Sequence, residues 1–333
     1  MSRSIFATLL LVSLALLHAT SACADDLVIA SWNLENLFDT ADDPKVEGDE
    51  DYTPESPKKW TKERLDIKLT NLASIISKMN DGKGPDVLGV CEIENHKVLE
   101  LLVEKLQPLG RKYEIVHKDS PSERGIDTAI IFDSTVFSLA DSKFHHVDAG
   151  KTRDIVEAKL HRKDNDLYVF MDHWPSRHHE SPSRNKAGDT ARQRIDEILA
   201  ADPKADIIML GDFNDESSDE SMRDHLRTVT SAENLPAGTM FDTTAPIKAA
   251  GKGTFVYNNK WDLLDHILVS PGLLDSAGYH WKDGSSQRLE YPELFYQPKY
   301  PDALNRPNTS YTKNVFHKEG YSDHLPLNCV ITQ

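Results

Sequence analysis

The sequence predicts one domain of many β-strands with helices packed on the outside. Short apolar runs rich in β-forming residues alternate with segments whose apolar residues recur every three or four positions, the patterns typical of buried strands and amphipathic helices. No internal repeat, low-complexity tract or linker interrupts the alternation. A layered domain with outer helices is the arrangement that buries both kinds of apolar face.

The N-terminal segment has the pattern of a secretory signal peptide. Arg3 precedes an almost wholly apolar run from Ile5 to Leu17, and Ala22-Cys23-Ala24 supplies small residues that a signal peptidase recognises. We expect cleavage after about Ala24, which leaves a mature domain at residues 25–333. A lipid anchor at Cys23 is the alternative. The apolar run is short for a membrane span, and no second one is long enough, so we expect a secreted or periplasmic protein without a transmembrane segment.

Charge and cysteine content argue against several classes of protein. Lys and Arg total 38 against 54 Asp and Glu, a formal net charge of -16. Such a chain is not expected to be a general nucleic-acid coat protein, although an enzyme with a local basic groove or a metal is compatible with it. Three cysteines do not make a disulfide scaffold or a Cys-rich zinc module. Cys91 and Cys329 lie in apolar runs, which predicts buried free thiols.

The expected elements follow one another along the mature chain. Apolar residues with helical spacing predict helices from Leu65 to Met79, after the capping residue Asn95, and from Thr190 to Ala200. Residues from Trp281 to Gly320 show no period and predict a long polar loop. The expected strands are apolar and short: Leu27–Trp32, Asp86–Cys91, Tyr113–Val116, Thr128–Phe132, Ile155–Leu160, Leu167–Met171, Ile207–Leu210, Thr254–Tyr257, Ile267–Ser270 and Leu325–Ile331.

Polar side chains cluster where the apolar strands stop. If the strands lie side by side, these ends converge on one rim and form a pocket rich in Asp, Asn, Glu and His. Oxygen donors with a few imidazoles favour Mg²⁺ or Mn²⁺ over structural zinc. Hydrolysis of a phosphate ester requires such a cation, a base for water and an acid for the leaving oxygen. The segments lie at residues 31–36, 91–95, 171–177, 211–215, 261–266 and 322–326.

Each segment taken alone also has a purely structural explanation. Gly-Asp-Phe-Asn at 211–214 suits an Asx turn, and His173 suits a packed residue beside Trp174. Glu92 is harder to explain in this way, because a carboxylate that ends a buried strand costs free energy unless it is paired or binds a metal. All the segments in this order together favour a functional site.

The ordered motifs carry a family resemblance. They are Trp-Asn-Leu-Glu-Asn, a Glu after an apolar strand, Asp-His-Trp-Pro-Ser-Arg, Gly-Asp-Phe-Asn-Asp, Asp-His-Ile-Leu-Val-Ser and Ser-Asp-His-Leu-Pro. From about Leu27 to Ile331 the chain resembles the endonuclease/exonuclease/phosphatase (DNase I-like) superfamily, and secreted bacterial nuclease members in particular. The resemblance implies an α+β fold, a four-layer αββα sandwich of two packed, mostly antiparallel sheets flanked by helices.

The resemblance also implies catalytic roles. His324 resembles the histidine that activates water, and Asp265 the aspartate that orients its imidazole. Asp212 and Asn214 resemble the pair that contacts the metal, the water and the scissile phosphate. His173 resembles the histidine that binds the phosphate and protonates the leaving oxygen.

Metal and phosphate ligands are implied in the same way. Glu92 resembles the principal ligand of the Mg²⁺ or Mn²⁺ ion, with Asn33 beside it and Asp323 as a further carboxylate. Among the basic residues after His173, Arg177 is the preferred phosphate ligand, because it sits at a strand end and its planar fork suits a phosphate. Arg124 is a second candidate for the rim.

The sequence departs from the family pattern at two positions. His266 stands after Asp265, where an aromatic residue is usual, and Cys91 stands before Glu92, where Gln is frequent. The first departure implies different local packing, and the second implies that a polar contact to Glu92 is missing.

These features favour a secreted, divalent-metal-dependent phosphodiesterase of nuclease type, whose partner is nucleic acid or another phosphodiester substrate. No stable protein partner is implied. The alternative is a phosphatase or phosphodiesterase for a small molecule or lipid headgroup, which the net charge favours slightly because a duplex needs many cationic contacts. A non-catalytic phosphate-binding protein is the third hypothesis. Loss of a site residue would be its signature, yet Glu92, Asp212, Asp265 and His324 are all present.

Overall fold

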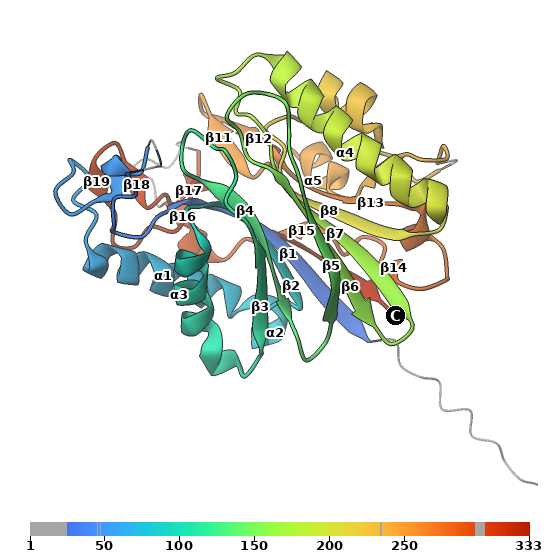
Figure 1. Cartoon of the computed structure of the whole chain (residues 1–333), viewed down its shortest axis with the longest axis horizontal. Helices are drawn as coiled ribbons and strands as arrows, with labels where there is room; N and C mark the ends of the chain where they lie inside the picture. Colours follow the sequence, from blue (N-terminus) through green and yellow to red (C-terminus); the bar gives the residue numbers. More distant parts are fainter. Residues whose placement is uncertain (1–24, 45, 47, 234, 297–303) are drawn as a thin grey trace, which may run out of the picture.

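The computed structural model describes residues 25–44, 46, 48–233, 235–296 and 304–333. The expected signal peptide lies outside these residues, as does part of the expected loop at 281–320. Figure 1 shows two sheets facing each other, with α1 and α3 outside one and α4 outside the other. This is the predicted αββα sandwich, and most neighbouring strands in it are antiparallel.

The first sheet has the strand order β14-β20-β1-β2-β4-β3, and β15 also pairs with β20. Its β1 and β2 are parallel because α1 carries the chain back between them. The strands of this sheet are β1 (Asp26–Leu37), β2 (Val87–Ile93), β3 (Tyr113–His117), β4 (Asp127–Asp133), β14 (His280–Trp281), β15 (Gln287–Arg288) and β20 (Leu327–Thr332).

The second sheet has the order β5-β6-β7-β8-β13-β10-β9. Here β7 and β8 are parallel, with α4 as their crossover. The edge strand β5 was not predicted, because most of its side chains are exposed and it has no apolar run. The strands of this sheet are β5 (Ser138–His145), β6 (Ile155–Arg162), β7 (Asn165–His173), β8 (Asp206–Asp212), β9 (Thr228–Val229), β10 (Met240–Asp242) and β13 (Asp265–Val269).

Helices cover the outer faces. Asn95 caps α3 as predicted, since its side-chain oxygen accepts a hydrogen bond from the backbone N–H of Val98 at 3.0 Å. Helix α4 begins at Ser181 rather than at Thr190, because its polar first half shows no apolar stripe in the sequence. The α-helices are α1 (Lys62–Ile76), α2 (Met79–Gly82), α3 (His96–Leu106), α4 (Ser181–Ala201) and α5 (Ala245–Ala249). Shorter helical turns are η1 (Glu50–Tyr52), η2 (Gln107–Leu109), η3 (Ser221–Leu226), η4 (Pro271–Leu274) and η5 (Pro292–Leu294).

Small hairpins complete the fold. The segment at 281–320, predicted as a loop without structure, contributes β14 and β15 to the first sheet and forms two short hairpins in its described part. Its two-residue strands are too short to give a period in the sequence. The remaining strands are β11 (Phe255–Tyr257), β12 (Lys260–Asp262), β16 (Phe295–Tyr296), β17 (Arg306–Pro307), β18 (Tyr311–Thr312) and β19 (Val315–Phe316).

Separate apolar clusters hold the layers together. One fills the space between the sheets, one lies under α1 and α3, and one lies under α4. The sheets approach closely at Gly89, where a β-carbon would lie 2.5 Å from the Met171 sulfur. Cys91 and Cys329 are buried and free, as predicted. Within the described ranges, no helix has the length and apolarity needed to cross a membrane.

The topology brings the polar strand ends to one rim. Parallel strands β1 and β2 end at the same edge of their sheet, as do β7 and β8. The antiparallel strands β13 and β20 begin at that edge, because β13 pairs with β8 and β20 with β1. The segments that surround Asn33, Glu92, His173, Asp212 and Asp265 therefore converge, and so does the segment before β20.

A buried carboxylate joins α4 to the second sheet. Glu157 on β6 accepts hydrogen bonds from the Arg194 guanidinium at 2.8 and 2.9 Å, and its carboxylate lies 2.6 Å from Nε2 of His145. Burial disfavours the carboxylate, but the hydrogen bonds from His145 and Arg194 outweigh burial and lower the Glu157 pKa from 4.5 to about 2.

Replacing Glu157 by glutamine is therefore expected to lower the free energy of unfolding at pH 7 by roughly 1–3 kcal/mol. A carboxyl group whose folded pKa is depressed stabilises the protein above its unfolded pKa, and this contribution is lost as pH falls from about 4.5 toward 2. In urea titrations the difference between wild type and Glu157→Gln should narrow between pH 7 and pH 3.5. A difference that stays constant with pH would contradict this assignment.

Candidate active site

A pocket of about 380 Å³ opens at the rim where the strand ends meet. Its walls come from both sheets and from the β11–β12 hairpin, so residues far apart in sequence share one cavity. The lining side chains are Asn36, Glu92, Arg124, His173, Ser176, Arg177, His178, Asp212, Asn214, Phe255, Tyr257, Asp262, Leu264, Asp323 and His324.

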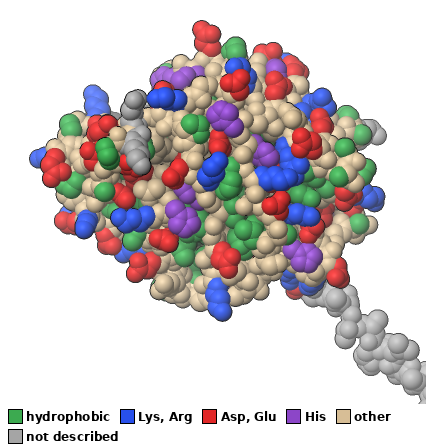
Figure 2. Space-filling view, viewed as in Figure 1, with side chains coloured by type: hydrophobic (Ala, Val, Ile, Leu, Met, Phe, Trp, Pro, Cys, Tyr) green, Lys and Arg blue, Asp and Glu red, His purple; other side chains and the backbone are tan. Residues whose placement is uncertain are grey.

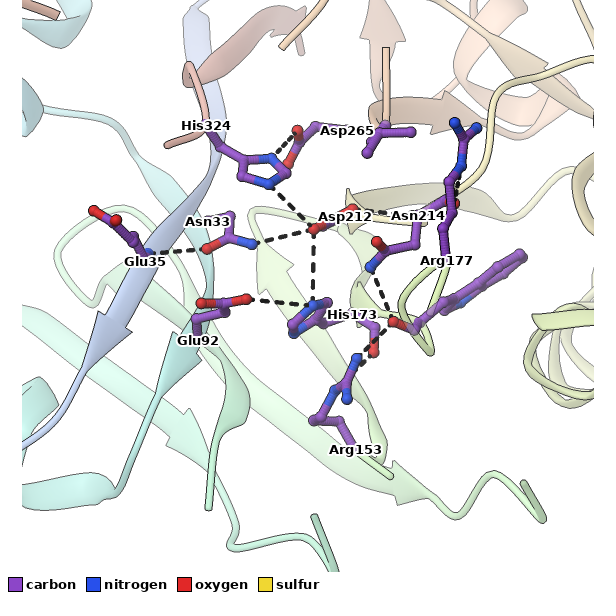
Figure 3. A network of polar contacts seen from close by, with 12 residues as sticks. Asn33, Glu35, Glu92, Arg153, His173, Arg177, Asp212, Asn214, Asp265 and His324 are labelled. Carbon is purple, nitrogen blue, oxygen red and sulfur yellow. Dashed lines mark hydrogen bonds and ion pairs between the residues drawn. The ribbon is translucent and has the colours of Figure 1, made fainter. Parts of the chain in front are cut away.

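His324 and Asp265 form a buried pair, as Figure 3 shows. Nδ1 of His324 lies 2.7 Å from Oδ2 of Asp265, and Nε2 of the same ring lies 3.7 Å from Oδ2 of Asp212. The Trp32 indole N–H donates to the His324 carbonyl at 2.9 Å, which fixes the backbone of this residue. One ring nitrogen is thus held by a carboxylate and the other is directed toward Asp212.

The charges around His324 determine its protonation. Burial disfavours the imidazolium, but attraction to Asp265 and Asp212 outweighs burial and raises the His324 pKa well above its ordinary value. Burial also raises the Asp212 pKa to about 6, against the attraction of His324. The negative charge of the buried carboxylates in the pocket therefore exceeds the positive charge of its histidines.

Asp212 occupies the centre of the site. Its Oδ2 accepts a hydrogen bond from the Asn33 amide at 3.1 Å, and its Oδ1 accepts one from the backbone N–H of Asn214 at 2.9 Å. The preceding Gly211 has φ 139°, and a β-carbon there would lie 2.0 Å from the Asp172 carbonyl oxygen. Only glycine fits this approach between β7 and β8. Gly211 is thus needed for the backbone geometry that places Asp212 between the sheets.

His173 lies across the pocket from His324. Its Nε2 is 3.7 Å from Oδ2 of Asp212 and 3.8 Å from Oε1 of Glu92. Burial and the nearby Arg153 charge lower the His173 pKa well below its ordinary value, so this imidazole is neutral. Its Nδ1 has no hydrogen-bond partner among the described residues. A neutral ring here donates or accepts hydrogen bonds but carries no charge.

Arg153 holds the backbone at His173 and Trp174 in place. Its guanidinium donates to the carbonyl of His173 at 3.1 Å and to that of Trp174 at 2.5 Å. Arg153 was not predicted as a site residue, because it stands among other charged residues ahead of an apolar strand and no motif includes it.

Glu92 ends β2 in a strained conformation. Its φ is 57°, and the pairing of β2 with β4 shifts register between Cys91 and Ile93. The carboxylate accepts from the backbone N–H of Asn36 at 3.0 Å and from Arg124 at 3.4 Å. Burial raises its pKa, but Arg124 and other cations outweigh burial and lower it overall. The bulge therefore directs an ionised carboxylate into the pocket.

The donor set fits a hard divalent cation. Burial and the neighbouring Glu35 charge raise the Asp323 pKa to about 7, so the Glu92 side of the pocket also has an excess of negative charge. The Asn33 amide oxygen accepts from the Glu35 N–H at 2.9 Å and keeps a second lone pair. Burial raises the thiol pKa of Cys91, so no thiolate joins the set. Carboxylate and amide oxygens are ligands that Mg²⁺ and Mn²⁺ prefer.

A second donor group lies in the same pocket. Asp212, Asp265 and His324 each offer one atom, and these atoms lie within 4.8 Å of one another. Asp265 and His324 are already bound to each other at 2.7 Å, however. The Glu92 side thus has the more suitable oxygen ligands.

Arg177 lies at the rim, as expected, but acidic neighbours hold it. Its Nε donates to the Asn214 carbonyl at 2.9 Å, and its terminal nitrogens lie 3.1 Å from Asp219 and 3.5 Å from Asp262. Arg124, the second rim candidate, also lines the pocket through its contact with Glu92. Both guanidiniums therefore face the cavity with part of their charge offset.

His266 is a structural residue in the described fold. Its Nδ1 lies 3.0 Å from the Asp242 carboxylate, and its Nε2 lies 3.0 Å from the carbonyl oxygen of Asp215. The ring also packs edge-on against Phe213 at 5.6 Å. His266 thus replaces the usual aromatic residue with a buried side chain that connects Asp242 to the loop after Asp212.

Comparisons with known proteins agree with this architecture. Zebrafish (D. rerio) TDP2 complexed with a single-stranded DNA product is 16% identical, with a TM-score of 0.58 over 92% of this chain and 99% of that one. A mannosyl-6-phosphatase of Bacteroides thetaiotaomicron is 18% identical, with a TM-score of 0.57 over 92% and 99%. The human nocturnin catalytic domain with bound sulfate is 18% identical, with a TM-score of 0.55 over 93% and 98%.

At these identities the structural likeness shows the fold. A comparison with curated proteins finds no significant match. The model of the Endonuclease/Exonuclease/phosphatase family matches residues 28–333, nearly the whole described chain. The chain therefore belongs to the endonuclease/exonuclease/phosphatase family.

Proposed function

We propose that the protein is a secreted or periplasmic, divalent-metal-dependent phosphodiesterase of nuclease type. Membership of its family supports a hydrolase of phosphate esters. The observation that carries the proposal is the pocket in which the His324–Asp265 pair faces Asp212, with Glu92 on the opposite side. The location outside the cytoplasm is inferred from the signal-peptide pattern of residues 1–24.

The His324–Asp265 pair is suited to activating water. In its neutral form His324 donates its Nδ1–H to Asp265 and leaves Nε2 free to take a proton from the attacking water. The charge of a bound cation would favour this neutral form, against the attraction of Asp265 and Asp212 for the imidazolium. Asp265 then stabilises the imidazolium. Asp212, 3.7 Å from Nε2, can accept the second hydrogen of the same water and orient its lone pair toward phosphorus.

Glu92, Asp323 and Asn33 would hold the cation. When bound, a divalent cation neutralises charge that develops on the phosphate oxygens. Arg124 and Arg177 stand at the rim and add guanidinium hydrogen bonds to the same oxygens. Asn214 lines the pocket beside Asp212. Its amide nitrogen donates to the Trp174 carbonyl at 3.1 Å and would direct its second hydrogen toward a bound phosphate.

His173 is suited to the leaving-oxygen side. Its neutral ring, between Asp212 and Glu92, can donate a hydrogen bond from Nε2 to a phosphate oxygen or to the departing oxygen. Arg153 keeps the ring in place through the backbone carbonyl. A neutral donor stabilises a leaving alkoxide without adding positive charge to the resting site.

A phosphatase acting on a small molecule is the second candidate. The pocket of about 380 Å³ and the net charge of -16 favour it, because both limit the contacts available to a long polyanion. The fold accommodates both kinds of substrate, since similar structures include TDP2 with a DNA product and a mannosyl-6-phosphatase.

A substrate panel separates these functions. Plasmid DNA, RNA, bis-p-nitrophenyl phosphate, p-nitrophenyl phosphate and sphingomyelin are each incubated with Mg²⁺ and with EDTA. We expect nucleic acid and the diester to be cleaved with Mg²⁺, the monoester to react slowly, and EDTA to abolish hydrolysis. Cleavage that persists in EDTA overturns the metal assignment, and exclusive monoester or lipid cleavage overturns the nuclease type.

A further inference from the structure

A short hairpin lies over the proposed base. Strand β11 places Phe255 against His324, with ring centroids 4.8 Å apart and an interplanar angle of 29°. The Leu325 N–H donates to the Thr254 carbonyl at 2.9 Å, so the hairpin is also joined to the chain next to His324. Other side chains on the same face of the hairpin are therefore held at a fixed position relative to His324.

The hairpin has a tight turn and is joined to the rest of the fold by Arg288. Its two-residue turn, Asn258-Asn259, has φ 46° and 58°, the left-handed conformations of a type I′ turn that asparagine tolerates. The Arg288 guanidinium donates to the Gly253 carbonyl at 2.7 Å and lies 4.7 Å from the Trp261 ring. Side chains on this hairpin are thus presented without a large cost in ordering.

Tyr257 is the aromatic side chain that the hairpin presents to solvent. It follows Phe255 by two residues, which places both on one face of the strand. Two residues along a strand advance about 6.8 Å, so Tyr257 lies roughly one nucleotide step outward from the ring that covers His324. Its side chain lines the pocket, yet 59% of it is exposed.

The arginines at the pocket are paired with acidic side chains, so a nucleic acid would need affinity from contacts other than ion pairs. Arg124 is paired with Glu92, and Arg177 with Asp219 and Asp262. On the face of the molecule that Figure 2 draws, basic and acidic side chains are interspersed. A nucleic acid therefore gains little from phosphate contacts alone, whereas stacking on an aromatic ring supplies affinity for any base.

We propose that Tyr257 is a stacking platform for the nucleobase next to the scissile phosphate. This inference rests on the proposed function and specifies its substrate: an unpaired strand or a frayed end. A base inside a duplex is already stacked on its neighbours, so only an unstacked base can lie on the Tyr257 ring.

The test compares two oligomers of equal length, hexathymidylate and a hexamer of abasic tetrahydrofuran nucleotides. Steady-state kinetics with Mg²⁺ give kcat/KM, and isothermal titration calorimetry in EDTA gives affinity. Tyr257→Ala should lower kcat/KM and affinity for hexathymidylate at least about fivefold and leave the abasic hexamer unchanged. Tyr257→Phe should keep the wild-type values. Tyr296→Ala, at another exposed tyrosine (50%) that does not line this pocket, is the matched control.

The outcomes distinguish this inference from the proposed function. If Tyr257→Ala slows both oligomers equally, the residue supports the hairpin and stacking is wrong. If the wild type binds both oligomers alike, stacking is also wrong. If the wild type cleaves neither oligomer but its affinity depends on the base and on Tyr257, stacking stands and the nuclease function is wrong.

Discussion

His324→Ala is expected to lower kcat for a phosphodiester substrate by at least about a hundredfold. In the proposed mechanism Nε2 of His324 takes the proton from water, while Nδ1 is held by Asp265 at 2.7 Å. Stopped assays with bis-p-nitrophenyl phosphate and saturating Mg²⁺ measure the loss. Asp265→Asn should also lose activity strongly, because an amide no longer favours the tautomer with Nε2 free.

The matched control is His280→Ala, which removes an exposed histidine from β14. It should retain wild-type turnover. Circular dichroism of all three variants establishes that they are folded. Near-normal turnover of folded His324→Ala would refute the role of His324 as general base.

Glu92→Gln is expected to have the second large effect, at least about a hundredfold lower activity with a much weaker affinity for Mn²⁺. The substitution keeps the size of the side chain and its place on β2 but removes the charge that would hold the cation. Isothermal titration with Mn²⁺ reports binding independently of turnover.

Glu94→Gln serves as the control for Glu92→Gln. The Glu94 carboxylate accepts from the Asp39 N–H at 2.6 Å and does not line the pocket, so Mn²⁺ affinity should not change. If Glu92→Gln binds Mn²⁺ as tightly as wild type does, the cation lies elsewhere.

Much of the site could be predicted because apolar strands end abruptly in polar residues. The run Ile207–Leu210 followed by Gly211-Asp212 identifies both a buried strand and the side chain at its end. In the same way, the apolar run of β2 identifies a buried strand, and Glu92 is the polar side chain where that run stops. Convergence then follows from topology, since parallel strands end and antiparallel strands begin at the same edge.

The other features of the site could not be predicted, because they depend on contacts between segments far apart in sequence. Arg153 acts through the carbonyl of His173, a backbone contact that leaves no motif. The position of Tyr257 requires the hairpin to pack on His324, although the strand itself was predicted. Arg177 was assigned from its place in a motif, but the acids that contact it come from elsewhere: Asp219 from the loop before η3 and Asp262 from β12.

Both the backbone strain and the excess of negative charge in the pocket favour a bound cation. Glu92 and Asn214 adopt left-handed backbone conformations, with φ 57° and 53°. Asp212 is buried and Asp323 is partly buried, and their pKa values are raised to about 6 and about 7. A bound cation would offset the repulsion among these carboxylates.

We expect side chains from both sheets to meet around one divalent cation and one phosphate. Crystals soaked with Mn²⁺ and inorganic phosphate, with diffraction data recorded at the manganese edge, test it most directly. We expect an anomalous peak coordinated by Glu92 and a phosphate between that peak and His324. A peak bound by Asp212, Asp265 and His324 without Glu92, or no peak in this pocket, would contradict it.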